Sequence, residues 1–324
     1  MRATFFLAVA LLMTAAACSY SNNGHPYNPP GNARGATHLV IGDISTQAIV
    51  TFPATATGNA APTYDLVGGA TLLDNPYSLW VDKANNVVWA ANCGGAGSVT
   101  KYALTATGNT APSIDLTGAA TLLSCPTGLF TTASGTLIVT DINNNSISTF
   151  AAGANGNTAP TSQIVGGSTG LGSPERIWPD ASGNIWVANY TPSAIYEFLA
   201  GASGNTAPHV TITGAATGLH LPNAMFIDQS GNIWTANNDG GSSSIEEFAA
   251  GSTGNATPMR VIAGTSTDQS APSGVVVDRS GYIYEADFDG VNVFAPTATG
   301  NATPIQVIKG ASTGLSEPAG IGIY

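Results

Sequence analysis

Two copies of one pattern decide the fold of this chain: PNAMFIDQSGNIWTAN at residues 222–237 and PSGVVVDRSGYIYEAD at residues 272–287. In each copy, two short runs rich in β-branched and aromatic residues flank an Asp-x-x-Gly turn. The Asp can accept hydrogen bonds within its own turn, and the Gly supplies the positive φ that a tight hairpin needs. Each copy therefore predicts a β-hairpin.

The pattern belongs to a repeat that runs along the chain. A Gly-Asn pair, followed by a Pro four residues after the Gly, begins at Gly58, Gly108, Gly156, Gly204, Gly254 and Gly300. Successive pairs are separated by 50, 48, 48, 50 and 46 residues. A period of about 40–50 residues without a helical pattern is typical of β-propeller blades.

Each unit contains four strand candidates, and the two ends of the chain complete one further unit. Residues 38–52 match the second and third strands of a unit, and residues 318–324 match a first strand. We therefore predict an all-β fold over residues 36–324. It is a six-bladed β-propeller with four antiparallel strands per blade and one blade closed by both termini, which leaves no open edge in the ring.

The unit P-x-G-[IV]-x-[VI]-D-x-x-G-N-I-[WY]-V-A-[ND] resembles the NHL repeat of six-bladed propellers. The resemblance covers essentially all of residues 36–324, although Thr132 replaces the turn Asp in one blade. It implies a binding face around the axial channel, made by the loops that enter strand one and those that join strands two and three. It leaves function open, because propellers host unrelated activities.

The N-terminus indicates export. Arg2 precedes a short apolar run at residues 5–13, and three Ala residues precede Cys18. This arrangement is typical of a signal peptide over residues 1–18. It resembles a bacterial lipoprotein signal, in which Cys18 would be lipidated, although Ala15 stands where that family usually has Leu; simple secretion is the alternative. Residues 19–35 predict a flexible linker, so we expect a protein of the cell envelope or a secreted one.

Composition limits the partners. The net charge of −11 with eight basic residues disfavours binding to nucleic acid phosphates. We expect contact with a membrane only through a lipid anchor, a monomeric chain, no cofactor, and a protein, peptide or glycan ligand.

Strand two ends in an Asx residue in every blade: Asp43, Asn92, Asp141, Asn189, Asn237 and Asp287. One interpretation is a ring of oxygen ligands for a polar ligand or a hard cation, with Asn189, Asn237 and Asp287 as binding candidates and Asp287 and Asp289 as weak metal candidates. The alternative is that each side chain caps its own loop, which is the commoner use of Asx in turns.

Residues that break the repeat are the better candidates for function. Glu175, Arg176, Tyr190 and His220 are predicted on the same face, and Arg176 could bind a carboxylate or phosphate. A Glu175–Arg176 surface pair is the alternative. Strand-one aromatics at Trp80, Phe130, Trp178 and Phe226 either line a pocket near the last blades or fill space between blades.

Catalysis has weak support. His220 with Asp239 or Glu175 could do acid–base work, but the chain carries no His cluster, G-x-S-x-G or H-E-x-x-H motif. We therefore expect a non-catalytic binding propeller, with a lyase or lactonase-like hydrolase of the same fold as the alternative.

The three Cys residues predict one disulfide. Cys93 begins a loop between strands two and three, and Cys125 ends the loop that enters the next blade. These loops are neighbours on one face, and an exported protein allows oxidation. We predict a Cys93–Cys125 bond; two unpaired thiols are the alternative.

Overall fold

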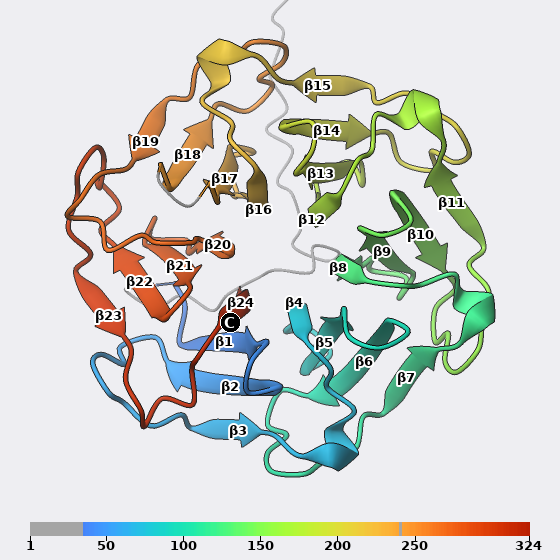
Figure 1. Cartoon of the computed structure of the whole chain (residues 1–324), viewed down its shortest axis with the longest axis horizontal. Helices are drawn as coiled ribbons and strands as arrows, with labels where there is room; N and C mark the ends of the chain where they lie inside the picture. The colour runs from blue at the N-terminus through green and yellow to red at the C-terminus, as the bar shows by residue number, and fades with distance from the viewer. Residues whose placement is uncertain (1–34, 240–241) are drawn as a thin grey trace, which may run out of the picture.

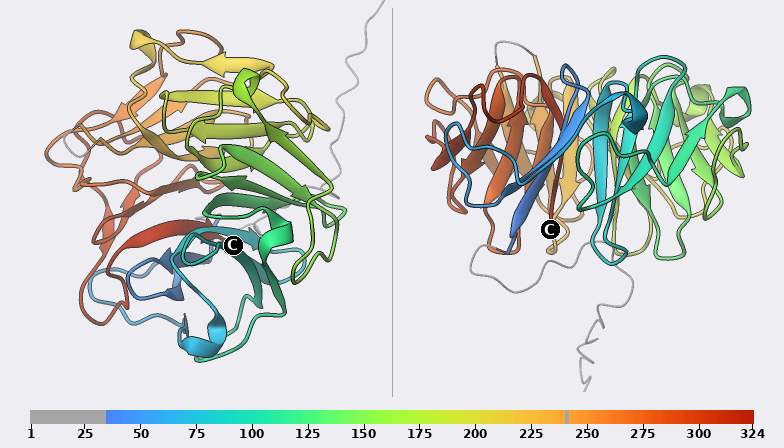
Figure 2. Two further views of the ribbon diagram at one scale, coloured as in Figure 1. Left: turned by 45° about the vertical axis from the view of Figure 1, so that its right-hand side comes forward. Right: turned by 90° about the horizontal axis from the view of Figure 1, so that it is seen from below.

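The computed structural model describes residues 35–239 and 242–324. The described residues form six four-stranded antiparallel sheets arranged as a ring around a central axis (Figure 1). Seen edge-on, the ring is a disc with loops on both faces (Figure 2). This confirms the predicted six-bladed propeller.

We number the blades along the ring. Blade 1 contains β24 (Pro318–Ile323), β1 (His38–Asp43), β2 (Ala48–Pro53) and β3 (Tyr64–Leu66). Blade 2 contains β4 (Pro76–Asp82), β5 (Val87–Asn92), β6 (Ser98–Ala103) and β7 (Ile114–Thr117). Blade 3 contains β8 (Pro126–Thr131), β9 (Leu137–Asp141), β10 (Ser146–Phe150) and β11 (Ser162–Val165).

The other three blades continue in the same order. Blade 4 contains β12 (Pro174–Pro179), β13 (Ile185–Asn189), β14 (Ala194–Phe198) and β15 (Val210–Ile212). Blade 5 contains β16 (Pro222–Ile227), β17 (Ile233–Asn237), β18 (Ser244–Phe248) and β19 (Arg260–Ile262). Blade 6 contains β20 (Gly274–Val277), β21 (Ile283–Asp287), β22 (Gly290–Phe294) and β23 (Gln306–Ile308).

In residues 35–239 and 242–324, helical structure is confined to single turns after the outermost strands. The 3₁₀ turns assigned in the described residues are η1 (Gly69–Thr71), η2 (Ala119–Thr121), η3 (Gly167–Thr169) and η4 (Ala215–Thr217). Within the described part of the chain, no helix is long and apolar enough to cross a membrane.

Both termini build blade 1, as the split repeat predicts. β24 pairs antiparallel with β1, with Leu39 opposite Ile323 and Ile41 opposite Ile321. The His38 and Tyr324 rings stack with their centroids 4.7 Å apart. The last strand therefore supplies the inner strand of the blade that the first strands begin.

The repeated Gly-Asn pair fastens neighbouring blades. The side-chain oxygen of Asn109 accepts a 2.7 Å hydrogen bond from the backbone N–H of Ala70, in the turn after the preceding blade. Asn157, Asn205, Asn255 and Asn301 make the same contact further along the ring. Asn59 closes the circle by accepting from the N–H of Ser312. Because each clasp links one blade to the next, the period of the sequence reports contacts between blades.

Buried strand-three aromatics supply much of the core. Phe52, Phe150, Phe198, Phe248 and Phe294 are fully buried, and Tyr102 takes this place in blade 2. Burying a large apolar side chain contributes about 1.5–3 kcal/mol each. The ring therefore has a rigid wall on which the loops of both faces are mounted.

Candidate functional site

The propeller has two faces. We call the "loop face" the one that carries the loops into strand one and those between strands two and three. The "turn face" carries the hairpin turns between strands one and two. The binding candidates Glu175, Arg176, Asn189, Tyr190, His220, Asn237 and Asp287 are all predicted on the loop face.

The Asx residues at the end of strand two hold loop backbone. The Asn189 side-chain oxygen accepts from the Gly172 N–H at 2.8 Å, and that of Asn237 accepts from the His220 N–H at 3.1 Å. Asp287 accepts from the N–H groups of Ser270 and Ala271. All three side chains are buried. They therefore hold the loop backbone, as the capping alternative describes.

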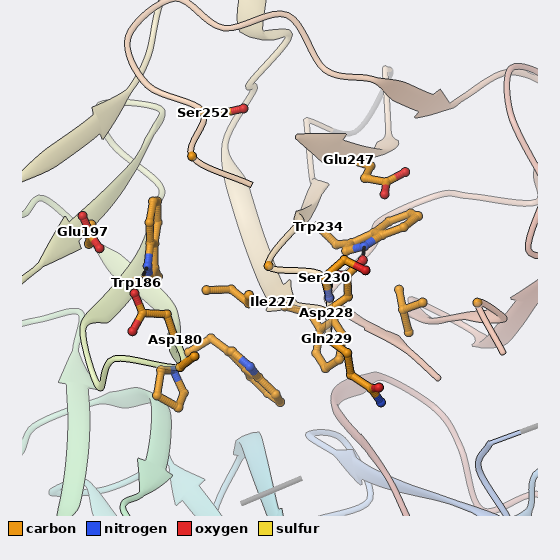
Figure 3. A pocket seen from close by; sticks show the side chains of 18 of the residues that line it. Asp180, Trp186, Glu197, Ile227, Asp228, Gln229, Ser230, Trp234, Glu247 and Ser252 are labelled. Carbon is orange, nitrogen blue, oxygen red and sulfur yellow. Dashed lines mark hydrogen bonds between the residues drawn. The ribbon is translucent and has the colours of Figure 1, made fainter. Parts of the chain in front are cut away.

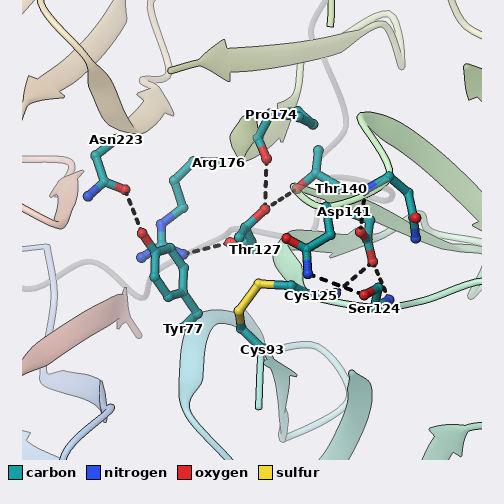
Figure 4. Close-up of a disulfide and its surroundings, with 12 residues drawn as sticks. Tyr77, Cys93, Ser124, Cys125, Thr127, Thr140, Asp141, Pro174, Arg176 and Asn223 are labelled. Carbon is teal, nitrogen blue, oxygen red and sulfur yellow. Dashed lines mark hydrogen bonds between the residues drawn. A yellow bond between two sulfur atoms is a disulfide. The ribbon is translucent and has the colours of Figure 1, made fainter. Parts of the chain in front are cut away.

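Arg176 lies beside Tyr77 and Thr127 (Figure 4), and its contacts with three other blades make it a plug near the axis of the ring. It is buried, and its guanidinium donates to three backbone carbonyls: Thr127 at 2.7 Å, Ser273 at 2.9 Å and Ala319 at 2.7 Å. It also lies 5.2 Å from the centroid of the Tyr77 ring. Burial excludes the predicted surface pair with Glu175, and the carbonyls occupy three of the five N–H donors of the guanidinium.

Glu175 is buried beside this plug. Its Oε2 atom has no hydrogen-bond partner within the described residues. Burial raises the pKa of Glu175 to about 7, against the smaller opposing effects of Arg176 and a Tyr77 hydrogen bond. The carboxyl is therefore a titrating group of the channel interior, with 2% of its surface exposed.

The remaining loop-face candidates are dispersed. His220 is 71% exposed, and its Nδ1 lies 3.6 Å from Oδ2 of Asp239. Tyr190 is partly exposed and close enough to Tyr77 to affect its pKa, which burial raises. Asp289 is 60% exposed and lies 3.6 Å from the Lys309 ammonium. Within the described residues, no group of three or more His, Cys, Asp or Glu could hold a metal ion.

The predicted disulfide is present on the loop face. Cys93 and Cys125 are bonded, with their Cα atoms 4.0 Å apart, and join the loops of blades 2 and 3 (Figure 4). This confirms the pairing inferred from two matching departures in neighbouring loops.

A large cavity lies on the turn face, away from the ligand-binding candidates predicted on the loop face. It has a volume of about 860 Å³ and spans the channel mouth and blades 4, 5 and 6. This size falls within the range of about 300–1,000 Å³ typical of small-molecule sites. Figure 3 shows Trp186, Glu197 and Asp180 on one side of it, and Trp234, Glu247 and Gln229 on the other.

Strand-one aromatics lie at the base of this cavity. Trp80, Trp178 and Phe226 line it. The centroid of the Trp178 ring lies 5.0 Å from that of Trp80 and 4.7 Å from that of Phe226. Blade 6 has the smaller Val276 at this position and blade 1 has Gly322. The aromatics therefore both fill space near the axis and line a pocket, so the two interpretations of the sequence describe one arrangement.

Hairpin carboxylates form the walls. Asp228 accepts four hydrogen bonds, including 3.1 Å from the Trp234 indole, and Asn232 bridges to Glu247 at 3.1 Å. Asp180 and Asn184 repeat this network around Trp186 and Glu197 in blade 4. Burial raises the pKa of Glu197 and of Glu247. The walls are thus acidic, held in place, and interleaved with indole rings.

The sequence carried a signal for these wall residues. The turn Asp, the Trp two residues after Asn184 or Asn232, and a strand-three Glu recur in blades 4 and 5 and in no other blade of the printed sequence. Because the turn pattern also serves the hairpin itself, it was interpreted only as a structural feature.

Several solved structures resemble the chain. A protein of unknown function from Bacteroides caccae superimposes with a TM-score of 0.62 and 10% identity, covering 88% of this chain and 98% of that one. A nidogen/laminin complex gives a TM-score of 0.58, 17% identity, and coverage of 88% and 97%. The WD40 β-propeller domain of Doa1 gives 0.56, 14% identity, and coverage of 80% and 75%. Neither a protein-family model nor a curated protein matches the sequence. At such low identity these likenesses establish a β-propeller fold alone.

Proposed function

We propose that this protein is a non-catalytic binding propeller that takes a peptide or glycan segment in the cavity of the turn face. The observation that carries the proposal is the cavity of about 860 Å³ with indole and phenyl rings at its base. Aromatic faces bind apolar side chains and stack on sugar rings, while carboxylates fix the orientation of polar groups.

The hydrogen bonding of the walls favours binding over acid–base catalysis. Both oxygens of Asp180 and of Asp228 accept hydrogen bonds from their own turn or from the neighbouring indole. A carboxylate held in this way supports the shape of the site. The alternative of a lyase or hydrolase would rely on His220 and Asp239, which lie on the loop face.

We also propose an NHL-type repeat and a place in the bacterial cell envelope, with Cys18 lipidated and residues 19–35 as the tether. Residues 1–34 lie outside the described residues, so this rests on the sequence. The Cys93–Cys125 disulfide supports it, since such bonds persist in exported proteins. The likeness to a chain of a nidogen/laminin complex is compatible with a binding role. Replacing Cys18→Ser should move the protein into the soluble fraction, and an unmodified Cys18 in the mass spectrum of the mature protein would contradict the anchor.

The binding function is tested with a fixed panel of short synthetic peptides and oligosaccharides. Tryptophan fluorescence is the readout, since five aromatic side chains line the cavity: Trp80, Trp178, Trp186, Phe226 and Trp234. We expect at least one class to quench the fluorescence of the wild type and Ser230→Trp, at the cavity rim, to abolish the effect. Ser134→Trp, in the corresponding turn of blade 3, is the matched control. Quenching by neither class, or equal quenching of the Ser230 variant, would overturn the proposal.

A further inference from the structure

The strand register aligns four side chains across each blade. In blade 5 the row contains Phe226, Trp234, Glu247 and Arg260. In blade 4 the same row contains Trp178, Trp186, Glu197 and Val210. Residues directly opposite one another on neighbouring strands share one face of the sheet. Both rows line the cavity.

In blade 5 a cationic side chain of the protein, Arg260, lies over the indole of the row. The Arg260 guanidinium carbon lies 5.0 Å from the centroid of the Trp234 ring, and Nε lies 2.9 Å from Oε2 of Glu247. In blade 2 a cation also lies over the indole, but it comes from strand three: the Lys101 ammonium is 5.1 Å from the centroid of Trp89. A cation is favoured over an indole face, and a carboxylate beside it adds a charge-assisted hydrogen bond.

Blade 4 has the indole and the carboxylate without the cation. The strand-four position that holds Arg260 in blade 5 is Val210, and in the part of the chain that the structure describes no Lys or Arg lies over the Trp186 ring. Oε1 of Glu197 accepts a 2.9 Å hydrogen bond from Asn184, and 6% of the Glu197 surface is exposed. Burial and then Asp180 raise the pKa of Glu197, while Asn184 and His209 act in the opposite direction.

We propose that the space over Trp186 is a subsite for the guanidinium group of the ligand, which takes the place that Arg260 fills in blade 5. The guanidinium stacks on the indole and donates to Glu197, with Asp180 as the second negative charge of the wall. This deepens the proposed function, because the subsite is part of the same cavity and defines one chemical feature of its ligand. At the strand-four position the two rows differ by one residue, which is Arg260 in blade 5 and Val210 in blade 4.

The same difference supplies the test, using calorimetric titration of the full chain with agmatine. We expect one site in the wild type. Val210→Arg supplies the missing cation internally and should weaken agmatine binding at least tenfold. Arg260→Val should open a second site and raise the stoichiometry from one to two. Thr211→Arg, one residue along the strand and on the opposite face of the sheet, is the matched control and should bind agmatine as the wild type does.

Two further probes test whether the subsite requires the guanidinium charge and whether the guanidinium belongs to a peptide or to a free compound. Nα-acetyl-arginine N-methylamide mimics an arginine within a peptide, and its citrulline analogue has the same shape without the charge. Tighter binding of the arginine amide than of agmatine assigns a peptide source, and the reverse order assigns a free guanidino compound; both support the subsite. Equal binding of the citrulline probe, no binding of either guanidinium probe, or equal binding by Val210→Arg would overturn it.

These outcomes are separable from those of the fluorescence panel. Panel ligands that bind while agmatine fails would leave the cavity as a binding site and remove the guanidinium subsite. Agmatine binding that Val210→Arg abolishes, with no response to the panel, would keep the subsite and remove the peptide or glycan proposal.

Discussion

The Arg176 guanidinium donates a 2.7 Å hydrogen bond to the carbonyl oxygen of Ala319, so that blade 4 is joined to the closing strand of blade 1 across the channel. The same side chain reaches blades 3 and 6 through Thr127 and Ser273. Its partner Tyr77 belongs to blade 2 and donates to Asn223 of blade 5 at 3.4 Å. One cluster at the loop-face end of the channel therefore contacts every blade.

Replacing Arg176→Met should lower the free energy of unfolding by about 3–5 kcal/mol, because buried acceptors lose a charged donor. Urea unfolding is the measurement. Arg279→Met, at an exposed position on the turn face, is the control and should change stability by about 0.5 kcal/mol or less. Equal effects of the two substitutions would contradict a central role for Arg176.

Glu175 should make stability depend on pH. Burial raises the pKa of Glu175 from 4.5 to about 7, so between these values the folded state binds a proton that the unfolded state has lost. Wild-type stability should therefore fall as pH rises through this window and level off above it. Glu175→Gln lacks the titration and should gain about 3 kcal/mol relative to the wild type between about pH 4.5 and about pH 8. Parallel unfolding free energies across this range would show that Glu175 does not titrate there.

The disulfide should stabilise the propeller through its closed loop. Cys93 and Cys125 are 32 residues apart, which corresponds to about 3–4 kcal/mol of chain entropy removed from the unfolded state. The double variant Cys93→Ser/Cys125→Ser should lose this amount and keep its β-sheet circular dichroism, since no blade ladder depends on the bond. An unchanged unfolding midpoint in the double variant would be the contrary result.

Deleting residues 319–324 should reopen the ring. The deletion removes most of β24, leaves the inner edge of β1 unpaired, and takes away the Ala319 carbonyl that Arg176 uses. Thermal unfolding should become broad, and the exposed edge should promote self-association. The control Tyr324→Leu keeps β24 and removes only the ring contacts of Tyr324, which are the stacking on His38 and the contact with the Lys83 ammonium, and should cost about 1–2 kcal/mol. A truncated chain as cooperative and as stable as the wild type would rule out closure by β24.

The sequence by itself determined the architecture. Its repeats encode local hairpins and the Asn hydrogen bonds between adjacent blades. Both features occur once per blade. The match of residues 38–52 and 318–324 to complementary parts of a unit therefore predicted how blade 1 closes. Cys93 and Cys125 could be paired for the same reason, because neighbouring repeat units become neighbours in space.

Tertiary structure alone decided which end of the channel is open. Arg176 reads as a surface residue in the sequence, yet carbonyls from three other blades surround its guanidinium. The sequence left open whether Trp178 fills space between blades or lines a pocket, and the structure shows that it borders the cavity. Both outcomes depend on how side chains of different blades meet at the axis, where the sizes of residues far apart in sequence determine what is filled. The repeat pattern does not encode how these side chains fit together. The difference between Arg260 and Val210 became interpretable only from the strand register, which places them at the same position in two blades.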